Sequence, residues 1–385
     1  MKKNLISYQR VNGERLGEGK RVNLSKTIIT LDLFMNRLLF PMLMAVSIII
    51  IFFSSCTKPG KPAEPENYIV TTLAGKGVDG FADGSGITAI FYGPKGIATD
   101  VQGNIYVADV GNNRIRKISA SGTVSTLAGN GRFGYVDGSN SVAQLTGPDD
   151  VATDALGNVY VTESNRIRKI TPAGEASTLT GGITGHVDGD LSTAQFGLLA
   201  GITTDAQNNI YVIDWGGNSP NFGARIRKIT PTGIVSTLAG NDIAGYIDGN
   251  GTAAQFLNPT GITTDPQGNV YVADYGNRRV RKITAAGVVS TLASIGSSPI
   301  SGPSDVAADS QGNIYVIQSG LNQSSIYMIT ASGTSTVVAG STGGYADGPG
   351  STALFKGLLG IALDAQGNIY VSDYTDSRIR KISKL

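Results

Sequence analysis

A six-fold internal repeat runs through most of this chain and constrains its fold more than any other feature. The most regular marker is Asn-Ile/Val-Tyr-Val, whose tyrosines are spaced by 54, 51, 60, 44 and 55 residues: Tyr106, Tyr160, Tyr211, Tyr271, Tyr315 and Tyr370. A repeat period of this length is typical of solenoids and propellers, in which each copy is one supersecondary unit.

Each copy contains four short β-prone segments. In the first copy they are Gly96–Asp100, Asn104–Asp109, Arg114–Ile118 and Thr123–Ala128. β-branched and aromatic residues fill these segments, and Gly, Asn or Asp bound them, as in strands joined by tight turns. Four antiparallel strands repeated six times predict an all-β fold, a six-bladed β-propeller of four-stranded antiparallel blades.

The ends of the repeat region do not coincide with the ends of a copy. Tyr68–Ala74 matches a fourth strand but precedes the first copy, and the chain ends in Arg378–Leu385, which matches a third strand. We therefore predict that the N-terminal strand completes the last blade, which closes the ring and removes a free strand edge.

The segment Gly93–Ile118, GPKGIATDVQGNIYVADVGNNRIRKI, resembles an NHL repeat, and the resemblance covers residues 68–385. It implies a six-bladed propeller. It implies little about activity, because propellers of this kind serve as binding platforms and, in related groups, as lyases or lactonases.

The N-terminal region has the features of an export signal. Leu38–Phe53 is uncharged, follows Arg37 and leads into Ser-Ser-Cys56. A membrane span needs roughly 20 residues, whereas a signal-peptide core of roughly 7–15 follows positive charge. Cys56, the only cysteine, stands where bacterial lipoproteins are lipidated; an uncleaved anchor helix is the alternative.

These features divide the chain into three regions. Residues 1–55 are predicted to be the leader and lipoprotein signal peptide, of which residues 1–34 are either an unusually long leader or a misplaced gene start. Residues 56–67 are a Pro-rich tether, and residues 68–385 form the propeller.

Charge and export together limit the partners. The chain carries +2 overall and +5 within residues 1–55, which leaves −3 on the rest. A mildly acidic body does not favour nucleic acid. We expect a monomeric propeller held by its lipid at the cell envelope, in the outer membrane, with the periplasmic or surface side left open, and a protein or glycan of the envelope as partner.

The single Cys and single His limit the chemistry. A zinc site built from several His or Cys cannot form. His186 occupies the aromatic position of a repeated loop and is interpreted as a packing residue, so no Ser–His–Asp set is expected. We predict no catalytic residue and no cofactor.

Acidic residues recur at two places in the repeat. The loops between blades share an aromatic-type residue followed by Asp-Gly, and the second strands end in an acid that faces arginines of the third strands. A ring of cation- or sugar-binding loops is one interpretation. We favour turns, packing and ion pairs within each blade, since five-fold repetition does not create a unique site, and exposed pairs contribute well under ~1 kcal/mol each.

The departures from the repeat are the better site candidates. Loops between second and third strands and between blades share one face, the long-loop face; the other turns form the short-turn face. On the long-loop face blade 3 has an extension containing Trp215, Asn218 and Phe222, which is either an aromatic anchor for a ligand or a lid on its own blade.

Two acidic residues and one missing loop complete the candidate face. The inner strands begin with Gly in four blades but with Asp150 and Asp305 in blades 2 and 5, on opposite sides of the ring. They are weak candidates for Ca²⁺, which takes 6–8 oxygen ligands. Ser294–Ser301 replaces the acidic loop before blade 5, which predicts a notch there.

Two function classes follow. The first is a non-enzymatic binding or scaffold module of the envelope that binds a protein or glycan on the long-loop face. The second is a hydrolase or lyase of lactone or carbohydrate type, with a divalent cation at the channel mouth. We favour the first, because the sequence contains no recognisable catalytic set.

Overall fold

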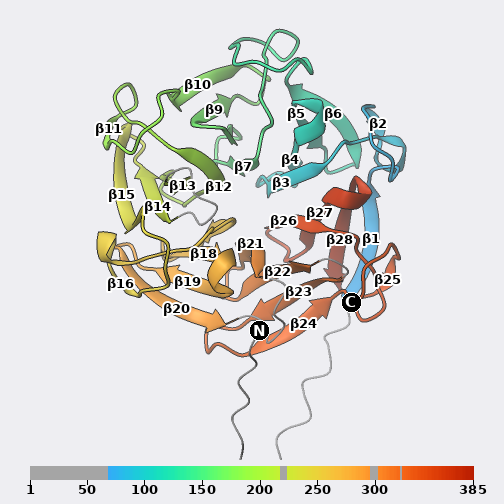
Figure 1. The fold of residues 1–385 in the computed structure, drawn as a ribbon. Coiled ribbons are helices and arrows are strands. Elements are labelled where there is room, and N and C mark those ends of the chain that lie inside the picture. The colour runs from blue at the N-terminus through green and yellow to red at the C-terminus, as the bar shows by residue number, and fades with distance from the viewer. Residues whose placement is uncertain (1–67, 217–222, 295–301, 321–322) are drawn as a thin grey trace, which may run out of the picture. The chain divides into compact units, whose positions relative to one another are not determined.

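The computed structural model describes residues 68–216, 223–294, 302–320 and 323–385. They form six antiparallel sheets arranged as blades around a central axis (Figure 1), which confirms the predicted six-bladed propeller. The predicted leader, Cys56 and tether lie outside the described residues. Within those residues, no helix is both long enough and apolar enough to cross a membrane.

Each blade runs from an inner strand at the axis to an outer strand at the rim. The inner strands are β3 (Pro94–Thr99), β7 (Asp150–Thr153), β12 (Leu198–Thr204), β17 (Ile262–Thr264), β21 (Pro303–Ala308) and β26 (Leu358–Leu363). The second strands are β4 (Ile105–Asp109), β8 (Val159–Glu163), β13 (Ile210–Trp215), β18 (Val270–Asp274), β22 (Ile314–Gly320) and β27 (Ile369–Asp373).

The outer half of each blade follows the same order. The third strands are β5 (Arg114–Ile118), β9 (Arg166–Ile170), β14 (Ala224–Ile229), β19 (Arg279–Ile283), β23 (Gln323–Ile329) and β28 (Arg378–Lys384). The fourth strands are β6 (Thr123–Ala128), β10 (Ala176–Gly181), β15 (Ile234–Asn241), β20 (Val288–Ser294), β24 (Ser335–Ala339) and, from the N-terminal end, β1 (Tyr68–Ala74).

Four blades depart from the predicted four strands. A two-residue strand from a between-blade loop pairs with the outer strand in blades 1, 3, 4 and 6: β2 (Gly84–Ser85), β11 (Gly189–Asp190), β16 (Gly249–Asn250) and β25 (Gly348–Pro349). The Asp-Gly of each loop supplies the turn, and the following residues run back along the rim. The blades are therefore four- or five-stranded.

The Asn-x-Tyr marker of the repeat forms a hydrogen-bonded turn between the inner and second strands. In blade 1, Asp100 Oδ1 accepts the backbone N–H of Gln102 (3.0 Å) and of Asn104 (2.8 Å). Its Oδ2 accepts Asn104 Nδ2 (2.7 Å) and the Tyr106 hydroxyl (2.9 Å). The marker recurs because all four donors are needed to satisfy one half-buried carboxylate.

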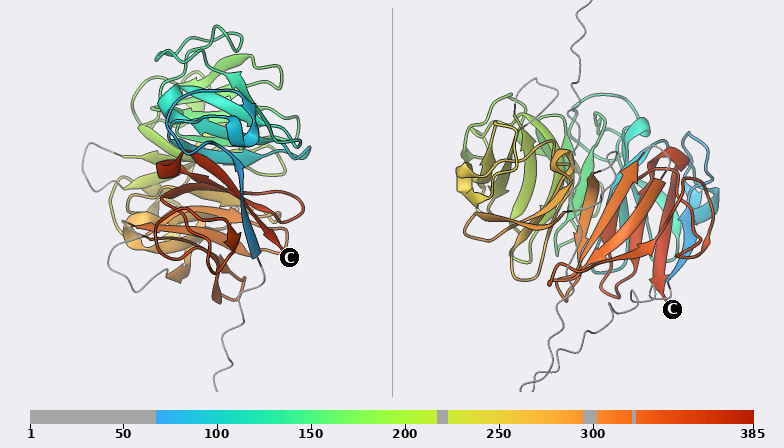
Figure 2. Two further views of the ribbon diagram at one scale, coloured as in Figure 1. Left: turned by 90° about the vertical axis from the view of Figure 1, so that its right-hand side faces the viewer. Right: turned by 60° about the horizontal axis from the view of Figure 1, so that its bottom comes forward.

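The N-terminal strand closes the ring. β1 pairs antiparallel with β28 from Tyr68 opposite Lys384 to Ala74 opposite Ile379. Figures 1 and 2 show this blue strand beside the red C-terminal strand. Asp347 accepts the backbone N–H (3.0 Å) and hydroxyl (3.1 Å) of Thr72, as the corresponding loop Asp of four other blades does with its own fourth-strand Thr.

The core lies between the blades. The buried apolar residues of the described regions form six clusters, and each cluster combines residues of two neighbouring blades. A fully buried aromatic side chain from the between-blade loop fills four of these interfaces: Phe91, Phe196, Phe256 and Phe355. Each blade is therefore stabilised by its neighbours, and the axial ends of the inner strands are held in a fixed ring.

Candidate functional site

An axial pocket opens on the long-loop face, where the six inner strands begin. Its volume is about 240 Å³, and every blade contributes to its lining. It brings together three of the predicted site residues, Trp215, Asp150 and Asp305. The other two, Asn218 and Phe222, lie outside the described residues. Whether the blade 3 extension is an anchor or a lid therefore stays open.

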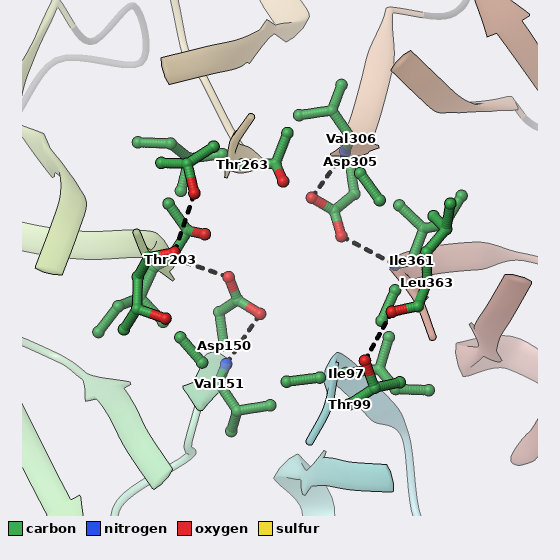
Figure 3. Close-up of a pocket in the computed structure, with 18 of the residues that line it drawn as sticks. Ile97, Thr99, Asp150, Val151, Thr203, Thr263, Asp305, Val306, Ile361 and Leu363 are labelled. Atoms are coloured by element: carbon green, nitrogen blue, oxygen red, sulfur yellow. Dashed lines mark hydrogen bonds between the residues drawn. The ribbon is translucent and has the colours of Figure 1, made fainter. Parts of the chain in front are cut away.

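Asp150 and Asp305 form the floor of the pocket. Asp150 accepts the backbone N–H of Val151 and of Ile202, both at 2.8 Å. Asp305 accepts the N–H of Val306 (2.8 Å) and of Ile361 (2.9 Å). Figure 3 shows the two carboxylates pointing into the same lumen from opposite sides. Since Ile202 and Ile361 belong to the following blades, each carboxylate also links two blades.

A glycine makes room for each of these carboxylates. A Cβ added to Gly96 or Gly261 would overlap Oδ1 of Asp150 or Asp305, respectively. The residues at this position repeat with a period of three blades: Gly96, Asp150, Gly201, Gly261, Asp305 and Gly360. Because a glycine precedes each aspartate around the ring, two charged side chains have room at a narrow axis.

Burial shifts the ionisation of both acids. It raises the pKa of Asp150 to about 7, although the N–H donors and Lys95 act in the opposite direction. Burial also raises the pKa of Asp305 well above its usual value, and the charge of Asp150 across the lumen raises it further. The charges of the two carboxylates therefore influence each other, and Asp150 ionises near neutral pH.

A separate ion pair stands at the rim of the pocket. Lys95 Nζ contacts Oδ1 of Asp149, and both residues line the pocket beside Asp150. The pair neutralises itself, so the two floor carboxylates set the net charge of the pocket. Lys95 and Asp149 were not predicted from the sequence. Each lies one residue before the Gly or Asp that begins the inner-strand motif of its blade.

Two aromatic side chains form the wall of the pocket. Trp215 Nε1 donates to the carbonyl oxygen of Pro259 (2.7 Å), and the side chain packs on the core between blades 3 and 4. Tyr275 begins the 3-10 turn after β18 and is 39% exposed. Tyr275 was not predicted from the sequence. It would have been found by comparing the six copies at the residue that follows the last acid or Gln of the second strand: Val110, Ser164, Trp215, Tyr275, Ser319 and Tyr374.

Below the two carboxylates the channel is lined by uncharged side chains. A second cavity of about 250 Å³ is lined by Ile, Leu, Val, Ala and Thr of the inner strands, together with Asp150 and Asp305. Four threonine hydroxyls donate to a carbonyl of the preceding blade at 2.6–2.9 Å: Thr99, Thr153, Thr204 and Thr264. These bonds join consecutive blades around the lower end of the channel, so charge enters it only at the two aspartates.

The repeated acidic loops have a structural role. Asp248 accepts from Arg281 Nη2 (2.7 Å) and from the backbone of Thr291 (3.1 Å), and the other four blades with this loop repeat the pattern. Arg281 also pairs with Asp274 (2.7 Å), and both side chains are fully buried. The predicted ion pairs exist. The small stabilisation expected for exposed pairs does not apply to them, because the arginine that pairs with both acids is buried in each of these blades.

Among the described residues, blade 5 has no such ion-pair network. Gln318 lies opposite Ser325, and Val316 lies opposite Tyr327, where other blades place arginine. On the long-loop face a hollow of about 410 Å³ lies at this blade, between Tyr275 and Tyr374 and above Ser319 and Gly320. The hollow shares Tyr275, Ser304 and Leu359 with the axial pocket. Residues 295–301, from which the notch was predicted, lie outside the described residues, so the notch stays a prediction.

His186 lies in the aromatic position of its loop, but it also has a polar role. Its Nδ1 is 3.2 Å from Oδ2 of Asp214. In blades 1 and 4 an asparagine, Asn112 or Asn277, donates to the corresponding oxygen. Blade 3 has its extension at that place, so His186 supplies the missing polar contact. His186 is not among the residues that line the axial pocket.

The described residues contain no group of three or more His, Cys, Asp or Glu that could hold a metal ion. Asp150 and Asp305 supply carboxylate oxygens, each already accepting one backbone N–H. Ca²⁺ takes 6–8 oxygen ligands, so the described pocket is a poor match for it.

Comparison with known proteins agrees with this architecture. The model of the NHL repeat matches residues 91–118 and 256–283. Teneurin-3 of Danio rerio is 31% identical over 230 residues, which is 52% of this chain and 8% of teneurin-3. The chloroplastic protein SUPPRESSOR OF QUENCHING 1 of Arabidopsis thaliana is 28% identical over 56% of this chain and 27% of its own length. This chain therefore corresponds to a minor part of each relative.

Solved structures show the same fold at low identity. A protein of unknown function from Bacteroides thetaiotaomicron has a TM-score of 0.61 at 18% identity, covering 82% of this chain and 76% of its own. Virginiamycin B lyase of Staphylococcus aureus has a TM-score of 0.54 at 16% identity, covering 83% and 100%. A gluconolactonase from Xanthomonas campestris has a TM-score of 0.55 at 14% identity, covering 85% and 98%.

Fold, repeats and comparisons agree on the class of protein. The chain is a six-bladed β-propeller that contains NHL repeats, which confirms the resemblance seen in the sequence. Its structural relatives include lyases, lactonases and regucalcin from Agrobacterium tumefaciens, which is described as calcium-binding. The shared fold does not by itself assign any of these activities.

Proposed function

We propose that this protein is a non-enzymatic binding module that holds a protein partner on its long-loop face, with the axial pocket as the anchor point. The observation that carries the proposal is the pocket itself. It combines two aromatic side chains with two carboxylates at the axis, where every blade contributes. Aromatic residues beside a pocket are common anchors of binding energy.

Exposed apolar residues on the same face support a protein partner. The between-blade loops present Val78, Phe133, Ile183 and Ile243, which are 51–72% exposed. Large side chains of this kind are common at protein interfaces. They lie on loops that share the long-loop face with the pocket.

The polar groups of the pocket favour a protein over a glycan. Lys95 pairs with Asp149, and the hydroxyls of Thr260 and Ser304 donate to the carbonyl oxygens of Pro303 and Ile317. A sugar ring needs partners for several hydroxyls, because burying an unpaired one is costly. Among the described lining residues, only the two floor carboxylates are charged groups without an ionic partner.

Replacing Trp215 tests the location of the site. An anchoring Trp contributes at least ~2 kcal/mol, which is roughly 30-fold in affinity. We expect Trp215→Ala to weaken binding of an envelope protein fraction by about that factor, with Tyr275→Ala acting in the same direction. Because Trp215 also packs on the core, its stability is measured alongside, and the exposed Tyr275 provides the variant with little folding cost.

The control for this experiment lies on the opposite face. Gln102 is exposed, and only its backbone N–H bonds to Asp100, so Gln102→Ala should leave both stability and affinity unchanged. A glycan array is measured in parallel. If Gln102→Ala weakens binding and Trp215→Ala and Tyr275→Ala do not, the binding face is the other one. Retention of array glycans instead of protein would replace the proposed partner.

One observation favours the alternative of a lyase or lactonase, and one speaks against it. The fold neighbours include such enzymes. Yet a variant of virginiamycin B lyase that lacks one histidine is catalytically inactive, whereas the only His of this chain lies outside the axial pocket, beside Asp214. Lactone hydrolysis measured with and without Ca²⁺ separates the two proposals, and we expect no turnover above buffer.

We propose further that a lipid on Cys56 attaches the module to the cell envelope through the tether of residues 56–67. The support is the uncharged run that ends at the only cysteine. Intact-mass analysis of the membrane fraction is expected to show a chain beginning at a lipid-modified Cys56. A chain that retains residues before Cys56, or one recovered without lipid, would contradict the proposal.

A further inference from the structure

The charge balance of the axial pocket leaves two carboxylates without a cation. Four charged residues line it, and Lys95 and Asp149 pair with each other. Within the described parts of the chain, no lysine, arginine or histidine forms an ion pair with Asp150 or Asp305. Two negative charges that face each other in a narrow lumen repel, and an added cation between them would relieve this repulsion.

Both carboxylates retain hydrogen-bonding capacity toward the lumen. Each of the four oxygens accepts one backbone N–H, whereas an ionised carboxylate has about four acceptor positions in all, two on each oxygen. The side chains are held by these N–H donors and point into the same space (Figure 3). When both aspartates are ionised, the floor of the pocket is therefore a fixed set of acceptors without a donor.

The walls above this floor suit an apolar stem. Trp215, Tyr275, Leu359 and Ala200 line the pocket, and the other lining residues include two glycines. Aromatic faces also attract a cation. An ammonium group has three donors and no acceptor, which matches a floor that offers only acceptors.

We propose that the axial pocket recognises a primary ammonium group on an apolar stem, and that in the protein partner this group is an exposed lysine side chain. The proposal deepens the proposed function and rests on it. The lysine enters from the long-loop face, its methylene groups contact Trp215 and Tyr275, and its ammonium lies between Asp150 and Asp305.

The test uses a small lysine probe on the full-length protein in detergent. Nα-acetyl-lysine N-methylamide is titrated by calorimetry, together with its Nε-acetylated form and the norleucine analogue, which lacks the ammonium. We expect the two uncharged analogues to bind at least 10-fold more weakly. Equal binding of all three, or no binding of the lysine probe, would overturn the proposal.

Two further probes separate other cations from lysine. Glucosamine carries an ammonium on a polar ring, and Ca²⁺ carries charge without a stem. We expect lysine to bind more tightly than glucosamine and Ca²⁺ not to displace it at equal concentration. Tighter binding of glucosamine, or displacement by Ca²⁺, would show that the pocket serves an amino sugar or a metal ion and would reject the lysine assignment.

The pH dependence provides a readout that needs no variant. Burial raises the pKa of Asp150 to about 7 and that of Asp305 well above its usual value, so the negative charge of Asp150 develops as the pH rises through neutrality. The lysine amine stays protonated until about pH 10. The affinity of the lysine probe should therefore rise about 10-fold from pH 6 to pH 8. A flat or falling profile contradicts the role of the carboxylates.

Variants complete the test. Asp305→Asn should reduce the affinity for the lysine probe at least 10-fold, and Gln102→Ala should not change it. If Asp305→Asn fails to fold because a backbone N–H loses its acceptor, the pH profile and the acetylated probe still decide. One combination of results would reject the lysine inference and leave the proposed function in place. In it, Trp215→Ala weakens binding of the protein partner, but the lysine probe does not bind and acetylation of the partner's lysines does not change the partner's binding.

Discussion

A variant lacking Tyr68–Gly75 is expected to unfold more than 10 °C below the full chain, or not to fold cooperatively. The deletion removes β1, in which Tyr68, Val70 and Ala74 are buried, and exposes the length of β28 as a free edge. Two large buried side chains correspond to roughly 3–6 kcal/mol. The deletion also removes Thr72, the partner of Asp347, from beside the buried Arg380. Circular dichroism on heating measures the effect.

Point variants within β1 give a matched control. Val70 faces the core and is 1% exposed, whereas the neighbouring Thr71 faces solvent. Val70→Asp should cost at least about 3 kcal/mol in the free energy of unfolding, and Thr71→Asp less than about 0.5 kcal/mol. Removing only residues 57–67 should leave the melting temperature unchanged. Unfolding of the deletion variant at the wild-type temperature would reject closure by this strand.

Replacing Asp274 by Ala is expected to lower the free energy of unfolding by about 3–5 kcal/mol, the usual result of removing one partner of a buried ion pair. Asp274 and Arg281 are both fully buried, and Asp274 also accepts from Leu257 N and Asn277 Nδ2 at 2.8 Å. Burial raises the pKa of Asp274 while these donors lower it, so the carboxylate depends on them. Without it, Arg281 keeps a buried charge beside only one acid, Asp248.

Two comparisons make this experiment specific. Asp248→Ala removes the partly exposed partner of the same arginine and should cost about 1 kcal/mol. Blade 5 naturally has Gln318 and Tyr327 at the two positions. The double variant Asp274→Gln with Arg281→Tyr copies it and should be more stable than Asp274→Gln alone, because no charge is left unpaired. Chemical denaturation of all four proteins measures the differences. Equal loss in Asp274→Ala and Asp248→Ala would contradict the importance of burial.

The repeat in the sequence was sufficient to predict the fold. Six copies of Asn-x-Tyr, each with four β-prone segments, specify six blades, because every copy contains the turn and strand residues that form the same local hydrogen bonds. The mismatch between the chain ends and the repeat ends was sufficient to predict how β1 completes blade 6, since only that pairing satisfies the last strand.

Part of the candidate site also followed from the sequence. Asp150 and Asp305 were found because they break a glycine pattern, and Trp215 because it is the only tryptophan. Tyr275, Lys95 and Asp149 were missed, since nothing in a single copy distinguishes them. They become site residues only because the ring brings the same position of different blades to one axis.

What the sequence determined by itself is therefore whatever each repeat encodes locally: the strands, the turns, the ring and its closure. The tertiary structure alone decided which side chains are buried and which meet. It placed one arginine of each of five third strands in the core, where its ion pairs matter for stability, although the sequence pattern of these strands resembles a surface. It also set two aspartates 155 residues apart across one lumen, because only closure of the ring places blades 2 and 5 opposite each other.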